Sequence, residues 1–167
     1  MPTPNDPHTL FSRVCALYAD YAACLDQGRF ADWPAFFTET DCLYELQPRE
    51  NYDRGLPLAT LWFESQGMLQ DRVYAVTDTL FHQPYYQRHV ISVPRILSKS
   101  AGVADDLIHV EANYAVFRTK RGGVSEVFNV GRYIDEIQTQ ADGALKFKTK
   151  RVIFDSELIL NSIIYPI

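Results

Sequence analysis

Concentrated positive charge is missing from this 167-residue sequence, which has 16 basic and 21 acidic residues and a net charge of −5. Nucleic-acid binding depends on clustered Lys and Arg that displace counterions, so no nucleic-acid partner is expected. Long apolar runs are also missing, because none approaches the ~20 residues that a membrane-spanning helix needs. Residues 1–7 lack the basic and apolar regions of a signal peptide. We therefore expect a cytoplasmic protein without membrane contact.

Cysteine is scarce and its pattern excludes several kinds of site. Cys15, Cys24 and Cys42 are odd in number and widely spaced, which argues against a disulfide framework or a zinc knuckle. No cysteine is followed two residues later by histidine, so an iron–sulfur centre with Cys and His ligands is not expected on this chain. A glycine-rich phosphate loop and the Gly-x-Ser-x-Gly motif of hydrolases are also lacking.

The composition is that of one globular domain with an ordinary core. Hydrophobic residues make up 47% and charged residues 22% of the chain, and its length suits a single domain. Aromatic residues reach 13%, with ten Tyr and ten Phe. Tyrosine is common at partly buried surfaces and interfaces, because its ring packs while its hydroxyl finds a polar partner.

The first half of the chain has a helical pattern. Early prolines predict a disordered tail over residues 1–8, and helical spacing of apolar residues predicts a helix over 9–27, ended by Gly28. Its buried face would consist of Leu10, Val14, Leu17, Tyr21 and Leu25. We further expect a short helix at 33–37, a strand at 42–47, a polar loop at 48–55 and a helix at 65–79.

The second half is typical of long strands. Alternating or β-branched segments predict strands over 87–97, 107–120, 126–137 and 144–154. Gly122-Gly123 and Asp142-Gly143 predict tight hairpin turns. Gly131 indicates a bend or bulge within its strand, and Pro94 indicates a bulge or an edge position. Helices followed by antiparallel strands predict an α+β fold, with residues 9–167 forming one cone-shaped domain.

Two histidines near a carboxylate form the strongest candidate for chemistry. Asp78, His82 and His89 are the ligand types of a non-haem iron(II) site. Pro84 favours a break between His82 and His89, so their convergence is not established. The structural alternative, in which His82 ends a helix and His89 hydrogen-bonds within the sheet or across an interface, is favoured, and no metal ligand or catalytic residue is assigned.

A free-standing cone-shaped enzyme is a second possibility. An isomerase or dehydratase would need an open apolar cavity with His89 facing a carboxylate, and a small-molecule-binding module would need only the cavity. His109 shares a strand face with Glu111 and Asn113, which indicates a solvent or partner surface. Whether Phe128, Tyr133 and Phe147 fill the cone separates these two alternatives from a structural role.

Seven segments, in order and spacing, resemble the β subunits of aromatic-ring-hydroxylating dioxygenases. They are 33–37 (WPAFF), 46–51 (LQPREN), 71–74 (DRVY), 86–89 (YQRH), 131–135 (GRYID), 155–157 (DSE) and 165–167 (YPI). Within that family the sequence most resembles salicylate 5-hydroxylase small subunits, with terephthalate- and anthranilate-type oxygenases as neighbours. The resemblance covers the chain from about residue 11 to its end.

The resemblance implies a nuclear-transport-factor-like (cystatin-like) cone that acts as a structural subunit in an α3β3 assembly. The partner α subunit would carry a Rieske [2Fe-2S] cluster and a mononuclear Fe(II). A ferredoxin and a reductase would deliver electrons from NAD(P)H. The resemblance places no catalytic, cofactor or metal residue on this chain, because those of the family belong to the α subunit.

Contact residues for such a partner are predicted from residue type, because aromatic and arginine side chains dominate interface energetics. The candidates lie in two segments: Tyr85, Tyr86 and Arg88, and the apolar C-terminus Ile163, Ile164, Tyr165, Pro166 and Ile167. The alternative for the second segment, that it closes the core of its own domain, remains open.

Overall fold

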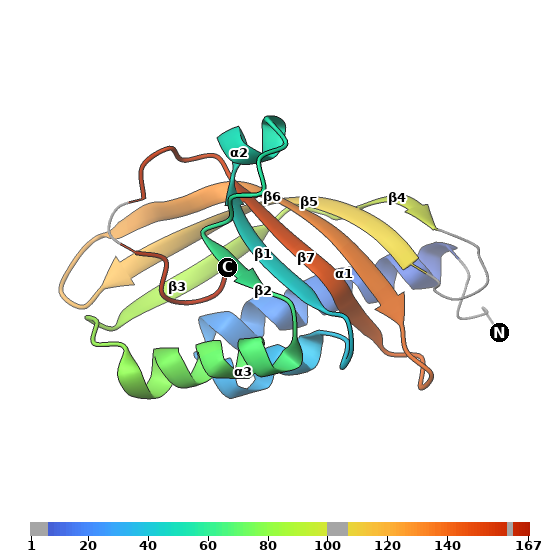
Figure 1. The fold of residues 1–167 in the computed structure, drawn as a ribbon, viewed down its shortest axis with the longest axis horizontal. Coiled ribbons are helices and arrows are strands. Elements are labelled where there is room, and N and C mark those ends of the chain that lie inside the picture. The colour runs from blue at the N-terminus through green and yellow to red at the C-terminus, as the bar shows by residue number, and fades with distance from the viewer. Residues whose placement is uncertain (1–6, 100–106, 160–161) are drawn as a thin grey trace.

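The computed structural model describes residues 7–99, 107–159 and 162–167. A seven-stranded sheet has the order β2-β1-β7-β6-β5-β3, and β4 also pairs with β5. Every pairing is antiparallel except that of β1 with β7. The strands are β1 (Leu43–Pro48), β2 (Leu61–Phe63), β3 (Tyr85–Ile91), β4 (Arg95–Lys99), β5 (Leu107–Lys120), β6 (Ser125–Thr139) and β7 (Leu145–Phe154). The sheet curves around α1 (Pro7–Asp26) and α3 (Gln66–Tyr74), which confirms the expected α+β cone (Figure 1).

The long N-terminal helix α1 packs its apolar stripe into the concave face of the sheet. All five residues predicted for that stripe, from Leu10 to Leu25, are buried. The helix begins at Pro7, two residues before its predicted start, since proline suits the first turn of a helix, where its missing N–H costs no bond. Residues 1–6 of the predicted tail lie outside the described residues. Gly28 follows the helix with φ +70°, as its predicted role as a stop requires.

Tight turns and bulges shape the long strands. Gly122 and Gly143 adopt positive φ in the two predicted hairpin turns. Gly131 has a different role from the predicted bend, because a Cβ there would lie 2.0 Å from the carbonyl oxygen of Ile153 on β7. The register shifts between β5 and β6 and between β6 and β7 lie elsewhere, after Val116 and after Glu136.

Several predicted boundaries were wrong for local reasons. The loop expected at 48–55 contains helix α2 (Arg49–Asp53), which two i,i+4 ion pairs stabilise. The strand expected at 87–97 is two strands, β3 and β4, separated by residues 92–94, which end in Pro94. The helix expected at 65–79 is α3, capped by the Ser65 hydroxyl, followed by a π-helical turn, η2 (Ala75–Thr79). The predicted helix at 33–37 is the 3-10 helix η1 (Phe30–Phe36), and the short β2 was not predicted.

Candidate functional site

The interior of the cone is filled by aromatic side chains around one buried lysine. The sequence left open whether Phe128, Tyr133 and Phe147 fill the cone. Tyr133 and Phe147 are fully buried, while Phe128 is only half-buried. Lys150 on β7 is also fully buried, and its Nζ lies 3.5 Å from the centre of the Tyr133 ring and 4.5 Å from that of Phe147. Cation–π contacts of this kind strengthen when they are shielded from water. Within the described residues, these side chains fill the centre of the cone.

Asp135 on β6 is the counter-ion of the buried lysine. Its Oδ2 lies 3.0 Å from Lys150 Nζ and accepts a 2.5 Å hydrogen bond from the Tyr18 hydroxyl of α1. Burial raises the pKa of Asp135 and lowers the pKa of Lys150, and their mutual attraction opposes both shifts. Asp135 Oδ1 and the Tyr133 hydroxyl are buried without hydrogen-bond partners. No local sequence pattern singled out Lys150 and Asp135, although both fall at inward-facing positions of their strands.

The three candidate metal ligands do not converge. His82 Nε2 lies 2.8 Å from the Tyr165 hydroxyl, and its Nδ1 lies 3.2 Å from the carbonyl oxygen of Leu80. Asp78 is hydrogen-bonded to its neighbour Thr77. His89 lies further along the chain against the end of α1. Among the residues that the structure describes, no three His, Cys, Asp or Glu side chains could hold a metal ion together, so this donor set does not fit a Rieske cluster or a mononuclear iron.

His89 joins strand β3 to the last residue of α1. Its side chain is fully buried, and Nδ1 lies 2.6 Å from Oδ1 of Asp26. The same carboxylate accepts the backbone N–H of His89 at 3.0 Å. The Nε2 atom is buried and has no hydrogen-bond partner. The favoured interpretation placed the bond of His89 within the sheet or across an interface. The structure instead shows a bond to a helix residue that no local pattern singled out.

The C-terminal segment packs on its own domain. Ile163, Pro166 and Ile167 are buried, and the backbone N–H of Ile167 donates to the Tyr44 hydroxyl. The Tyr165 ring lies 4.4 Å from the ring of Tyr85, measured between centroids. These contacts are those of the alternative in which the segment closes its own core. Ile164 is half-buried.

The remaining predicted contact residues lie on or near the surface of β3. Tyr86 is 65% exposed and Arg88 is exposed, while Tyr85 is half-buried. The Arg88 guanidinium reaches back to the carbonyl oxygen of Asp26 at 3.4 Å. Two of the predicted side chains are therefore accessible on this strand.

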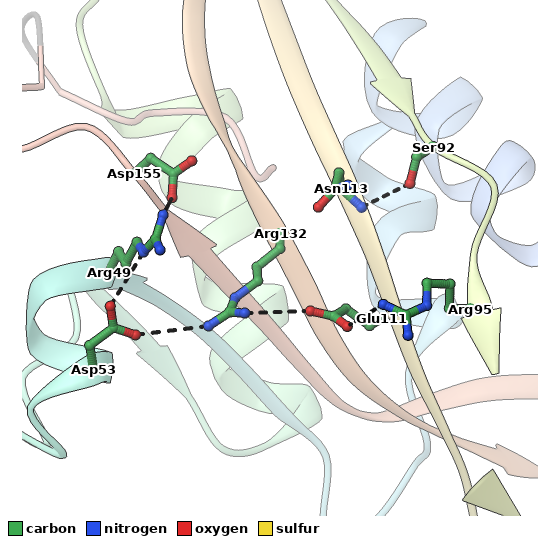
Figure 2. Close-up of polar contacts among 8 residues, drawn as sticks. All are labelled: Arg49, Asp53, Ser92, Arg95, Glu111, Asn113, Arg132 and Asp155. Carbon is green, nitrogen blue, oxygen red and sulfur yellow. Dashed lines mark hydrogen bonds and ion pairs between the residues drawn. The ribbon is translucent and has the colours of Figure 1, made fainter. Parts of the chain in front are cut away.

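The outer face of the sheet carries a chain of ion pairs. Arg132 on β6 lies between Glu111 of β5, at 3.5 Å, and Asp53 of α2, at 3.9 Å (Figure 2). Arg49 connects Asp53 to Asp155 beyond β7, as Figure 2 also shows. We call these five residues the outer ion-pair chain.

Further polar contacts extend across the same face. Arg95 of β4 lies 3.6 Å from Glu111, and the backbone N–H of Asn113 donates to the Ser92 hydroxyl. His109 lies 3.9 Å from Glu136, also on this face, as its position beside Glu111 and Asn113 predicted. This part of the outer face is therefore polar and partly exposed. Among the described residues no helix is long and apolar enough to cross a membrane.

The comparisons with known proteins agree with the geometry. The sequence matches the family described as ring hydroxylating beta subunit over residues 21–161. It is 37% identical over 163 residues to the small subunit of anthranilate 1,2-dioxygenase from Burkholderia cepacia, covering 98% of this chain and 97% of that one. It is 33% identical to subunit beta 2 of the terminal oxygenase component of terephthalate 1,2-dioxygenase from Comamonas, covering 86% and 90%.

A solved structure gives the same result. The β subunit assigned to an aromatic-ring-hydroxylating dioxygenase of Novosphingobium aromaticivorans superposes with a TM-score of 0.81 at 34% identity, covering 95% of this chain and 96% of that one. The family match spans most of the described chain, and the similar proteins are matched over nearly their whole length. The chain therefore belongs to the ring-hydroxylating β-subunit family and is the small subunit of a multicomponent ring-hydroxylating dioxygenase.

Proposed function

We propose that this chain is a non-catalytic scaffold that assembles with an iron-bearing α subunit as α3β3 in the cytoplasm. The Rieske [2Fe-2S] cluster and the mononuclear Fe(II) belong to the α subunit, which receives electrons from NAD(P)H through a reductase and a ferredoxin. The filled interior of the cone carries this proposal. Lys150, Asp135 and the surrounding rings occupy the space in which a cone-shaped enzyme would bind its substrate.

The substrate of the assembly is a single-ring aromatic carboxylate, and we favour salicylate. Two similar proteins are named for anthranilate and terephthalate, which are both benzene carboxylates. Salicylate differs from anthranilate only in having a hydroxyl in place of the amine beside the carboxylate. The hydroxyl of salicylate and the amine of anthranilate are both hydrogen-bond donors, and they occupy the same position on the benzene ring.

Exposed residues of β3 are the best candidates for the contact with the α subunit. Tyr86 projects from the strand with 65% of its surface exposed, and Arg88 lies two residues away on the same face. Buried tyrosine and arginine anchors typically contribute 2 kcal/mol or more to an interface, about thirtyfold in affinity. Within the described residues β3 pairs with β5 alone, and the end of α1 hydrogen-bonds to β3 at Arg88 and His89.

Co-expression with the cognate large subunit tests the proposal. A tag on this chain should recover a complex with the mass of a hexamer, whose iron and acid-labile sulfide remain with the large chain after the subunits are separated. The complex should oxidise NAD(P)H in response to salicylate when reductase and ferredoxin are added. This chain alone should turn over no aromatic carboxylate. Recovery of the chain as a metal-free protein that never binds the large subunit would overturn the proposal.

The contact is tested by paired variants. Tyr86→Ala with Arg88→Ala should weaken recovery of the large subunit at least tenfold. A matched control combines Trp62→Ala and Arg54→Ala, which remove one exposed aromatic and one exposed arginine from β2 and the end of α2. The control should leave recovery unchanged. Equal recovery for both double variants would exclude this part of β3 from the interface.

A further inference from the structure

A cleft of about 510 Å³ lies at the mouth of the cone, apart from the filled interior. Its walls come from the residues after η2, from the start of β3, from the end of β5 and from the C-terminal segment. Ligand sites for small molecules typically measure roughly 300–1,000 Å³ and combine apolar walls with a few polar groups. The cleft therefore has the dimensions of a site for a small organic molecule.

Among the described residues, the cleft is lined by three cationic side chains and by no Asp or Glu. Arg118 is paired with Glu126 at 2.6 Å, but Arg72 and Lys120 have no ion pair within the part of the chain that the structure describes. Burial lowers the pKa of Arg72, and no carboxylate opposes that effect. In a chain with a net charge of −5, this is a local excess of positive charge. An anion bound here would offset the cost of holding these charges partly out of water.

Arg72 also has a donor to spare. Its Nη2 donates to the carbonyl oxygens of Ile163 and Ile164, which holds the guanidinium in place. Its Nε–H is buried and makes no hydrogen bond. Nη1 is the guanidinium nitrogen left for a ligand oxygen, because it has no hydrogen-bond partner among the described residues and is not among the buried atoms. The planar arrangement of guanidinium donors matches the geometry of a carboxylate.

The apolar wall of the cleft includes a phenylalanine that is entirely exposed. Phe81 has a relative exposure of 103%, and its neighbour Leu80 is 42% exposed. The backbone N–H of Leu80 donates to the carbonyl oxygen of Ala75, so the end of η2 fixes this segment beside the cleft. A flat ring lying on these side chains would remove apolar surface from water. The cleft thus offers cations for one end of a ligand and an apolar wall for the other.

We propose that this mouth cleft binds a free aromatic carboxylate, with the carboxylate near Arg72 and Lys120 and the ring against Leu80 and Phe81. The choice of a ring-bearing carboxylate rests on the proposed function, whereas the affinity for an anion rests on the lining alone. A carboxylate side chain of the α subunit has the same chemistry. The experiment below separates these two sources.

The test uses the full-length chain without its partner, so that the active site of the α subunit contributes no binding. Binding of 4-fluorobenzoate is followed by its fluorine NMR signal, with 4-fluorobenzamide as the uncharged analogue and trifluoroacetate as the anion without a ring. The benzoate should bind at least tenfold more tightly than either analogue. Equal binding of benzoate and benzamide would overturn the proposal, because the cations would then have no role.

Variants locate the site. Lys120→Gln and Phe81→Ser should each weaken benzoate binding about tenfold, a loss of one interaction worth roughly 1.4 kcal/mol. Arg54→Gln and Leu97→Ser are matched controls at exposed positions of the turn after α2 and of β4, and should bind benzoate like the unaltered chain. Circular dichroism spectra should show that all four variants are folded. Unchanged binding in both Lys120→Gln and Phe81→Ser would overturn the assignment.

A final titration distinguishes the source of the carboxylate. The large subunit is added in an iron-free form. The fluorine NMR signal should show that 4-fluorobenzoate stays bound to this chain in the resulting complex. Displacement of the ligand, together with weaker recovery of the large subunit by Lys120→Gln, would assign the cleft to a partner side chain and overturn the proposal. Benzoate binding without any recovery of the large subunit would instead overturn the proposed scaffold function alone.

Discussion

The two faces of one sheet hold their charges in different ways. On the concave face, Lys150 and Asp135 form a single ion pair with both side chains fully buried. On the outer face, Arg132 and Glu111 form a similar pair between neighbouring strands, yet 34% and 23% of their side chains remain exposed. Strand β6 contributes to both pairs, because successive residues of a strand point to opposite faces.

The difference in burial determines what each pair can do. A buried pair is expensive to desolvate and is very costly to break, since the remaining charge has no water around it. A hydrated pair is worth little and can be rearranged or covered. The inner pair is therefore part of the packed core of the cone. The outer ion-pair chain lies on a surface whose side chains can rearrange when a partner binds. The proposed scaffold function uses both properties.

Alkaline pH should have the largest effect, because it destabilises the buried tyrosines of the concave face. Burial raises the pKa of Tyr18, Tyr21, Tyr44, Tyr114 and Tyr133 above the ordinary value of about 10. The fold holds these protons more tightly than the unfolded chain does. This stability is therefore fully present below pH 10 and is lost as the pH rises above it. Between the unfolded-state and folded-state pKa of each tyrosine, the free energy of unfolding should fall by about 1.4 kcal/mol per pH unit.

Urea unfolding at pH 8, 10 and 11 measures this effect. The midpoint should hold between pH 8 and a little below 10 and then fall steeply. Absorbance at 295 nm should report tyrosine ionisation in the same pH range as the loss of structure. Ionisation of all ten tyrosines while the fold stays intact would show that the inner face is more accessible than its burial indicates.

Breaking the inner pair should be the most damaging single substitution. Lys150→Ala leaves Asp135 buried without its counter-ion and opens a void among the rings, so we expect a loss of about 3–5 kcal/mol in the free energy of unfolding. Denaturant titration measures it. The comparison is sharpened by Lys150→Met combined with Asp135→Leu, which removes both charges and should recover a large part of the loss. A double variant as unstable as the single one would contradict this electrostatic explanation.

The contact between His89 and Asp26 should have an intermediate effect. His89→Ala removes the bond to the carboxylate and a buried ring, and we expect a loss of roughly 2 kcal/mol. Because the contact joins β3 to the end of α1, hydrogen exchange should accelerate at both elements and less elsewhere. His109→Ala is the matched control on the outer face, where the imidazole is 35% exposed and lies 3.9 Å from Glu136. Equal losses for the two variants would contradict the difference between the faces.

Much of the fold could be predicted from the sequence, because it follows from local periodicity. The bounds predicted for β5 agree with the structure, and the two hairpin turns were found from glycines whose conformation the turns require. The errors arose where tertiary contacts override local pattern. Gly131 was expected to bend its strand, but its missing side chain makes room for the carbonyl oxygen of Ile153.

The candidate site was harder to predict, because its partners are far apart in the sequence. Asp26 and His89 are separated by 63 residues, and Tyr18 and Asp135 by 117. Residue type singled out Tyr133 and Phe147 as the rings to look at, but whether they fill the cone depends on the curvature of the sheet, which no local pattern gives. It did not find Lys150, because a lysine on a strand is ordinarily expected to face water.

The outer ion-pair chain should show the smallest effect, and its response to salt should be the clearest sign of the difference between the faces. Arg132→Ala removes contacts to Glu111 and Asp53, yet we expect a loss of less than about 1 kcal/mol, since hydrated ion pairs contribute little. Raising the salt concentration from about 0.05 to about 1 M shortens the Debye length to roughly 3 Å. This screening should erase most of the loss caused by Arg132→Ala. The loss caused by Lys150→Ala should persist, because ions do not enter the filled interior. Urea titrations of both variants at the two salt concentrations provide the measurement. If salt leaves the loss for Arg132→Ala unchanged, this guanidinium stabilises the fold by packing over Tyr52, 5.5 Å from the ring centre, and not by its ion pairs.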